Sequence, residues 1–247
     1  MYKHTFINLF VLLILSGCGG GGSGSAAPST SAEGLWMGTT GDGREIAGLV
    51  LDSGEYWVLY SLVGNNAVIA GAVQGNGTSQ NGSFTSSNGK DFNLEGDGIS
   101  NTTTNANYVM KQSFNGTISY PATGVQNSFT TSYDAAYELV PDLNTISGTY
   151  TGSAATNGGT VFATVTVTGT GVLTGSSAGG CTYNGTVTPR ANGNVYNVTV
   201  TFNGGACSNG TNTVTGVAYY TAASKQLNSA ALDSSRSNGF IFVGTKP

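Results

Sequence analysis

Few of the side chains that carry enzymatic chemistry are present in this chain of 247 residues. It contains one histidine, His4, and three cysteines, Cys18, Cys181 and Cys207. A Ser-His-Asp or Cys-His arrangement needs a histidine beside the nucleophile, so such catalysis could use only His4, close to the amino terminus. Histidine-based zinc sites are limited in the same way. The commonest hydrolase designs are therefore excluded if His4 is removed by processing.

Carboxylates are the remaining groups that could supply an acid and a base. The candidates are Asp42 with Glu45, Glu95 with Asp97, and Glu55. Two facing carboxylates would suffice for glycosidase-like hydrolysis, but acids that neighbour glycine, such as Asp42 and Asp97, are more often turn residues. The repeated acidic spacing of an EF-hand is also missing. We therefore expect no catalytic residue, no metal and no cofactor.

The first 17 residues have the layout of an export signal peptide. Lys3 and His4 precede an apolar run of eleven residues at 5–15, which is too short to span a membrane because a spanning helix needs about 20. The next residues, Leu15-Ser16-Gly17-Cys18, resemble the lipobox of bacterial lipoproteins. That resemblance implies cleavage before Cys18 and a diacylglyceryl thioether on its sulfur, a membrane anchor. An ordinary secretory signal is the alternative.

The segment after the signal predicts a lipid-anchored protein of the cell envelope. Residues 18–33 are almost entirely Gly, Ser, Ala, Pro and Thr after the cysteine, which is typical of a flexible linker. Gly19 follows the cysteine where an aspartate could stand, and in enterobacterial lipoproteins this pattern indicates the outer membrane. The inner or outer leaflet is left open.

The predicted mature chain is acidic. Removal of the leader leaves seven basic against twelve acidic residues, a net charge of −5. Since no basic stripe is present to displace counterions from phosphates, nucleic acid is not an expected partner. The membrane, reached through the lipid, and an unknown protein or small ligand are the expected partners.

Cys181 and Cys207 are left as a pair once Cys18 is assigned to the lipid. An even pair in an exported protein predicts a disulfide. A disulfide that closes this loop of about 26 residues would stabilise the fold by roughly 3 kcal/mol on the entropic model. A metal pair is the alternative, although no histidine or second cysteine pair lies nearby.

Apolar residues recur with period two, as in Tyr196, Val198, Val200 and Phe202, which alternate with polar residues. This pattern indicates half-buried antiparallel strands. Asn-Gly and Asp-Gly pairs punctuate the strands and supply the positive φ angles of tight hairpins. The sequence therefore predicts an all-β fold of consecutive antiparallel meanders.

Two lobes of about eight strands each are predicted, an N-terminal β-barrel at 34–141 and a C-terminal β-barrel at 142–247. Eight antiparallel strands close into a barrel and so remove exposed sheet edges. The strands expected in the first lobe are 35–40, 45–52, 56–62, 67–74, 83–86, 91–96, 108–120 and 128–140. Those expected in the second are 148–154, 160–168, 171–176, 181–189, 195–203, 214–221, 227–232 and 239–244.

Each lobe opens with a similar motif, Gly34-Leu35-Trp36 in the first and Gly148-Thr149-Tyr150 in the second. This Gly-x-aromatic start resembles that of lipocalin and avidin barrels, and the resemblance implies that the ring closes one end of the barrel. Lipocalins also bring an arginine from the last strand against this ring. The first lobe offers none there, and in the second Arg236 only precedes the last strand.

The strands between residues 46 and 73 are apolar on both alternating faces. Both faces must therefore be covered, and the first interpretation is that these strands form the contact between the lobes. The second is a ligand or partner surface, in which Tyr56, Trp57 and Tyr60 are the large amphipathic side chains favoured at recognition sites.

The segment 128–140 fits two structures. Phe129, Tyr133 and Tyr137 match period two and also helical spacing, and good helix formers lie at 134–139. We expect a strand, with a helix as the alternative.

The function predicted from the sequence is that of a non-catalytic, lipid-anchored envelope protein that binds a ligand or a partner. Display at the cell surface is compatible with this prediction. A structural or assembly lipoprotein of the outer membrane is the alternative, and a carboxylate-dependent hydrolase is the second alternative. A long exposed aromatic patch would favour the first, a barrel with short loops and a lumen filled by its own side chains the second, and two facing carboxylates in a cleft the third.

Overall fold

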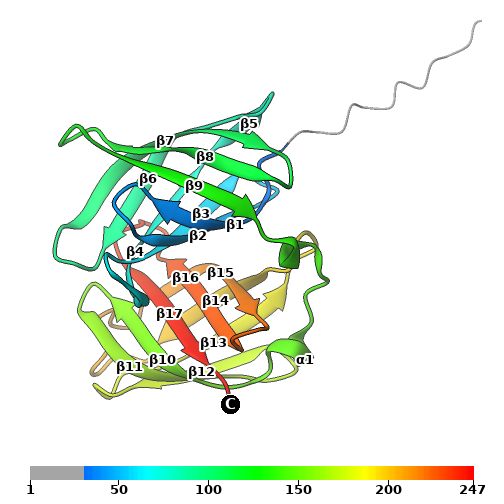
Figure 1. Ribbon diagram of the computed structural model, residues 1–247. Helices are drawn as coiled ribbons and strands as arrows, with labels where there is room; N and C mark the ends of the chain where they lie inside the picture. Colours follow the sequence, from blue (N-terminus) through cyan, green and yellow to red (C-terminus); the bar gives the residue numbers. More distant parts are fainter. Residues whose placement is uncertain (1–30) are drawn as a thin grey trace, which may run out of the picture.

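The computed structural model describes residues 31–247 as two β-barrels joined by a short linker (Figure 1). The predicted signal peptide, the lipobox and Cys18 lie outside the described residues. In the figure the first barrel, coloured blue to green, lies above the second, coloured green to red. Neither short helix within residues 31–247 has the length or the apolar character needed to cross a bilayer.

The first barrel consists of eight strands and a short ninth one at its edge. The sheet runs in the order β4-β3-β2-β1-β9-β8-β7-β6-β5, and pairing of β4 with β6 closes it. Every pair is antiparallel, as hairpin connections require. The strands are β1 (Gly34–Thr40), β2 (Glu45–Val50), β3 (Glu55–Leu62), β4 (Asn65–Asn76), β5 (Thr78–Gln80), β6 (Ser83–Asn93), β7 (Gly98–Val109), β8 (Ser113–Tyr120) and β9 (Val125–Tyr133).

The second barrel is a closed meander in which each strand pairs with the next and β10 pairs with β17. Its strands are β10 (Gly148–Thr156), β11 (Gly159–Val167), β12 (Val172–Ser177), β13 (Thr182–Pro189), β14 (Tyr196–Phe202), β15 (Thr213–Thr221), β16 (Gln226–Leu232) and β17 (Gly239–Thr245). The prediction of two consecutive antiparallel eight-stranded barrels is confirmed.

The expected strands match closely in the second barrel but not in the first. All eight of the second barrel begin and end within two residues of the expected bounds. In the first, the strands expected at 83–86 and 91–96 are one strand, β6, and the strand expected at 108–120 is two, β7 and β8. The turn between β7 and β8 has no glycine and instead places Lys111 at a φ of 55°, so the sequence carried no usual turn signal there.

The expectation of a strand over 128–140 is wrong beyond Tyr133, where β9 ends. Asp134 accepts a hydrogen bond from the Ala136 amide, 2.9 Å, and caps the 3₁₀ helix η1 (Ala135–Glu138). An Asp at this position satisfies an otherwise unpaired amide and so starts a helical turn. A second turn, α1 (Leu143–Ile146), is capped in the same way by Asp142 before β10 begins.

The aromatic residue that opens each barrel closes one end of it. The Trp36 indole nitrogen donates to the Ala32 carbonyl, 2.9 Å, and the Tyr150 hydroxyl donates to the Ile146 carbonyl, 2.7 Å. Each ring therefore holds the segment four residues before it across the barrel end. Lys246, directly after β17, lies over the Tyr150 ring at 5.6 Å from the centroid, whereas Arg236 instead donates to the Gln74 carbonyl of the other barrel, 2.6 Å.

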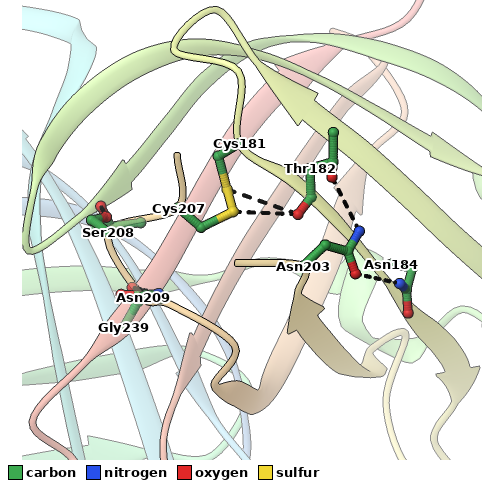
Figure 2. Close-up of a disulfide and its surroundings, with 9 residues drawn as sticks. Cys181, Thr182, Asn184, Asn203, Cys207, Ser208, Asn209 and Gly239 are labelled. Carbon is green, nitrogen blue, oxygen red and sulfur yellow. Dashed lines mark hydrogen bonds between the residues drawn. A yellow bond between two sulfur atoms is a disulfide. The ribbon is translucent and has the colours of Figure 1, made fainter. Parts of the chain in front are cut away.

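The predicted disulfide between Cys181 and Cys207 is present (Figure 2). It joins the residue that precedes β13 to the loop between β14 and β15. Beside it, Asn203 donates to the Thr182 hydroxyl, 3.1 Å, and accepts from Asn184, 2.9 Å. The crosslink and these amides fix one end of the second barrel.

The two barrels contact each other through β2, β3 and β4 of the first and β15, β16 and β17 of the second (Figure 1). Outward-facing apolar side chains of both barrels form one buried cluster, with Trp57, Leu49, Leu59, Val217, Tyr219, Ala230 and Ile241 among its members. An ion pair between Arg190 and Asp52, 2.7 Å, borders this contact. The apolar outer face of the strands between 46 and 73 is therefore covered by the second barrel.

Candidate functional site

The first barrel encloses a cavity of about 470 Å³. This volume lies within the range of roughly 300–1,000 Å³ that is usual for small-molecule sites. The cavity is lined by the inward side chains of the strands, among them Trp36, Ile46, Gly48, Val50, Tyr56, Val58, Tyr60, Phe84, Asp91, Thr104, Phe114, Ile118, Tyr120, Phe129 and Thr131.

Alternation along β2 and β3 decides which apolar residues line the cavity. Side chains of successive strand residues point to opposite faces. Tyr56 and Tyr60 point inward with Val58, whereas Trp57 points outward into the contact between the barrels, where it is 4% exposed. Of the three residues predicted for binding, the structure thus brings two to the cavity and places the third at the barrel contact.

Small inward residues leave the cavity open. Gly48 and Thr131 stand where a larger side chain would extend into the lumen. A Cβ added at Gly48 would meet Trp36 and Val58 at only 3.7 and 3.9 Å, which is ordinary van der Waals contact. The space beyond Gly48 is therefore available to another occupant.

The inner end of the cavity is aromatic. Phe114 lies 5.5 Å from Trp36, 5.4 Å from Phe84 and 5.5 Å from Phe129, measured between ring centroids. Tilted and edge-to-face contacts at such distances are favourable for aromatic pairs. We call these four rings the aromatic floor, and they present an apolar surface to whatever enters.

Two glycines of β4 give the inward tyrosines of β3 their positions. A Cβ at Gly71 would lie 2.1 Å from the Tyr60 hydroxyl oxygen, and one at Gly75 would lie 2.7 Å from that of Tyr56. Because both approaches are closer than real Cβ contacts, only glycine lets the tyrosine rings lie against β4. The Tyr56 hydroxyl then shares a hydrogen bond of 3.1 Å with Thr104.

A buried carboxyl group lies between the floor and the open end. Asp91 is 3% exposed, and its two oxygens accept hydrogen bonds from Tyr60, 2.8 Å, and Tyr120, 2.9 Å. Burial raises the pKa of Asp91 above its ordinary value, against the opposite effect of the two hydroxyls and of Arg44. Burial and the neighbouring carboxyl also raise the pKa of both tyrosines.

Arg44 lies at the open end, which we call the mouth. Its guanidinium donates to Asp42, 3.1 Å, to Glu95, 2.6 Å, and to the Ser61 carbonyl, 3.0 Å. It also lies over the Tyr60 ring at 5.4 Å from the centroid. Burial would lower the pKa of Arg44, but the bonds to Glu95 and Asp42 outweigh it and raise the pKa.

The carboxylates considered for catalysis are bound by different partners, except that Asp42 and Glu95 share Arg44. Asp42 and Glu95 bind Arg44, Glu45 accepts from the Asn66 amide, 2.6 Å, and Glu55 accepts from the Trp57 indole, 2.9 Å. Asp97 lines the mouth of the cavity. Within residues 31–247 no three acidic or cysteine side chains gather as a metal site would require.

Asp91 and Tyr120 are site residues that the sequence did not reveal. Simple alternation from Phe84 and Ser86 would place Phe92 inside the barrel and Asp91 outside. A bulge between Ser86 and Gly89 shifts the register and reverses the faces beyond it. The Asn88-Gly89 pair, which lies between the strands expected at 83–86 and 91–96, is the one signal that could have indicated this shift.

Comparison with known proteins identifies no family. No family model matches the chain, and no curated protein matches it. A crystal structure of a candidate outer membrane protein from Bacteroides fragilis aligns over 87% of this chain and 96% of its own, at 15% identity and a TM-score of 0.28. At that TM-score the two backbones have too little in common to transfer a fold or a function.

Proposed function

We propose that this protein is a non-catalytic, lipid-anchored binding protein of the cell envelope whose first barrel holds a small, largely apolar molecule. The observation that carries this proposal is the cavity of about 470 Å³, open at one end and apolar at the other. Sites of this kind combine an apolar lining with a few polar groups that orient the ligand. Here the aromatic floor supplies the first and the groups around Asp91 supply the second.

Location in the envelope rests on the lipobox at Leu15–Cys18, and the outer membrane rests on Gly19 after the cysteine. Two or more acyl chains would hold the protein at a bilayer in a stable way. Replacement of Cys18 by Ser should move the protein from the membrane fraction to the soluble fraction. A Cys18→Ser variant that stays in the membrane fraction would remove the lipid anchor from the proposal.

Lumen binding can be measured with N-phenyl-1-naphthylamine, a neutral apolar fluorophore that brightens in apolar surroundings. The wild-type protein should bind it, and Gly48→Leu should lose most of that binding because the leucine side chain would occupy the cavity. Thr39→Leu is the matched control, since Thr39 lies on the outer face of the neighbouring strand β1 and is exposed. Binding that Gly48→Leu leaves unchanged would place the fluorophore outside the lumen.

The filled lumen of the second barrel favours a structural role for that barrel. Its inward side chains fill the lumen, as the buried positions of Tyr150, Tyr183, Tyr196, Phe202 and Phe242 show. We infer that this barrel supports the first and that any assembly role belongs to it. Deletion of either barrel is a poor test, because each barrel buries apolar residues against the other. Fluorophore binding to the lumen of each barrel should therefore be measured in the full chain.

A further inference from the structure

The three polar side chains that meet at Asp91 present acceptors rather than donors to the lumen. Tyr60 and Tyr120 each donate the hydroxyl proton to one oxygen of Asp91, at 2.8 and 2.9 Å. A tyrosine hydroxyl has one proton and two lone pairs, and an ionised carboxylate only accepts. With both protons directed at Asp91, the three side chains offer only lone pairs to an occupant of the cavity.

Asp91 also lacks a cation within ion-pair distance. Among the described residues no lysine or arginine forms an ion pair with it, and Arg44 is paired with Asp42 and Glu95 instead. Buried charges in proteins are normally paired, since an unpaired one is costly to desolvate. Two neutral hydroxyl donors compensate a buried carboxylate only in part, and a cationic group in the cavity would complete the compensation.

The charge around the cavity is negative, like that of the Asp91 carboxylate. Residues 31–141 contain ten acidic and three basic residues. At the mouth, Asp42, Glu95 and Asp97 stand against Arg44 alone, whose Nε and Nη1 already donate to two of these acids. The potential at the entrance is therefore negative and would attract a cation and repel an anion.

From these observations we propose that the lumen recognises the ammonium group of a primary amine whose remaining part is apolar. The ammonium group carries three donors and no acceptor, which matches the carboxylate of Asp91 and the hydroxyl oxygens of Tyr60 and Tyr120. Asp91 lies nearer the mouth than the aromatic floor, so the amine is held on the mouth side and the apolar part lies against the floor. This inference rests on the proposed lumen binding.

The test compares four ligands with the same eight-carbon chain by displacement of N-phenyl-1-naphthylamine from the full chain. Octylamine should bind at least about tenfold more tightly than 1-octanol, since hydrogen bonds to charged groups are worth more than neutral ones. Octanoate should bind most weakly. Octyltrimethylammonium has the charge but no N–H donor, and it should bind more weakly than octylamine.

A variant pair identifies the residue responsible. Asp91→Asn removes the charge with little change in shape and should abolish the preference for octylamine over octanol. Glu45→Gln removes the same charge from the outer rim of the same barrel, where Glu45 is exposed, and should keep that preference. The wild-type ranking of the four ligands stands as a test even if Asp91→Asn does not fold.

The outcomes separate this inference from the proposed function. Equal binding of octylamine and octanol, or tightest binding of octanoate, would overturn the inference while lumen binding stands. If octyltrimethylammonium binds as tightly as octylamine, the matched hydrogen bonds are not what recognises the ligand, and the inference fails. Failure of the fluorophore itself to bind would overturn the proposed function.

Discussion

The two barrels share strand number and closed antiparallel meander architecture, yet one lumen is open and the other is filled. Inward positions of the second barrel carry Tyr183, Phe202 and Phe240, whose ring centroids lie 5.1 to 5.7 Å apart. Inward positions of the first include Gly48 and Thr131, and its rings gather at one end. The size and distribution of inward side chains, rather than strand number, therefore determine whether a barrel of eight strands has room for a ligand.

The barrels also differ in charge. Residues 31–141 contain ten acidic and three basic residues, whereas residues 142–247 contain two acidic and four basic ones. The only described carboxyl group that is both deeply buried and inside a barrel, Asp91, belongs to the first. The cavity and the excess of negative charge thus belong to the same barrel, as a site for a cationic ligand requires.

The largest expected effect comes from the contact that joins the barrels. Trp57→Ala should destabilise the protein by about 3–5 kcal/mol, because it removes a large buried ring and leaves a void between the barrels. Urea unfolding measures the loss, and Met37→Ala, an exposed position on the outer face of β1, is the control. A loss no larger than that of the control would mean that the barrels barely depend on this contact.

Removal of the disulfide should affect mainly the second barrel. The double variant Cys181→Ala, Cys207→Ala should lose roughly 3 kcal/mol of stability, because its unfolded chain regains the entropy of a loop that spans 26 residues. Amide hydrogen exchange should quicken first in β13, β14 and β15. Equal acceleration throughout the first barrel would show that the two barrels unfold as one unit.

A matched truncation tests the difference in packing directly. Val200 is fully buried in the second barrel, while Val58 borders the cavity of the first. Val200→Ala should cost about 2 kcal/mol, and Val58→Ala less than about 1, since the latter only enlarges an existing space. Thermal and urea unfolding give both losses of stability. Equal losses would indicate that the first barrel contracts and fills its own cavity.

The smallest effects should appear as opposite responses to acid. Burial keeps the pKa of Asp91 above the ordinary 3.8, so this group destabilises the fold at neutral pH, and stability is gained as pH falls toward 3.8. For Asp233, burial is outweighed by bonds from Asn238, Ser237 and Ser235, which lower the pKa to about 2. Its contribution is present above 3.8 and is lost as pH falls through about 2.

Unfolding curves recorded between pH 7 and pH 2 measure these two contributions. Asp91→Asn should remove the gain on mild acidification, and Asp233→Asn should remove part of the loss at lower pH. If Asp91→Asn leaves the profile above pH 4 unchanged, the carboxyl group has an ordinary pKa and its surroundings are wetter than the structure indicates.

Much of the second barrel could be predicted from its sequence, and less of the first. Thr alternates with Val along β11 and β14, so the strands and their inward faces can be read directly. In the first barrel β7 is polar along much of its length, and the turn at Lys111 has neither glycine nor asparagine. Strands without a clear apolar face and turns without turn residues leave no local signal.

The sequence by itself determined the class of fold and the pairing of Cys181 with Cys207. These features depend on alternation, on spacing and on counting, which are local properties. Only the tertiary structure decided that Trp57 belongs to the barrel contact, that Tyr56 and Tyr60 face a cavity, and that Asp91 joins them. Those placements depend on the bulge in β6 and on how much of the lumen distant strands leave unfilled, which are properties of the closed barrel.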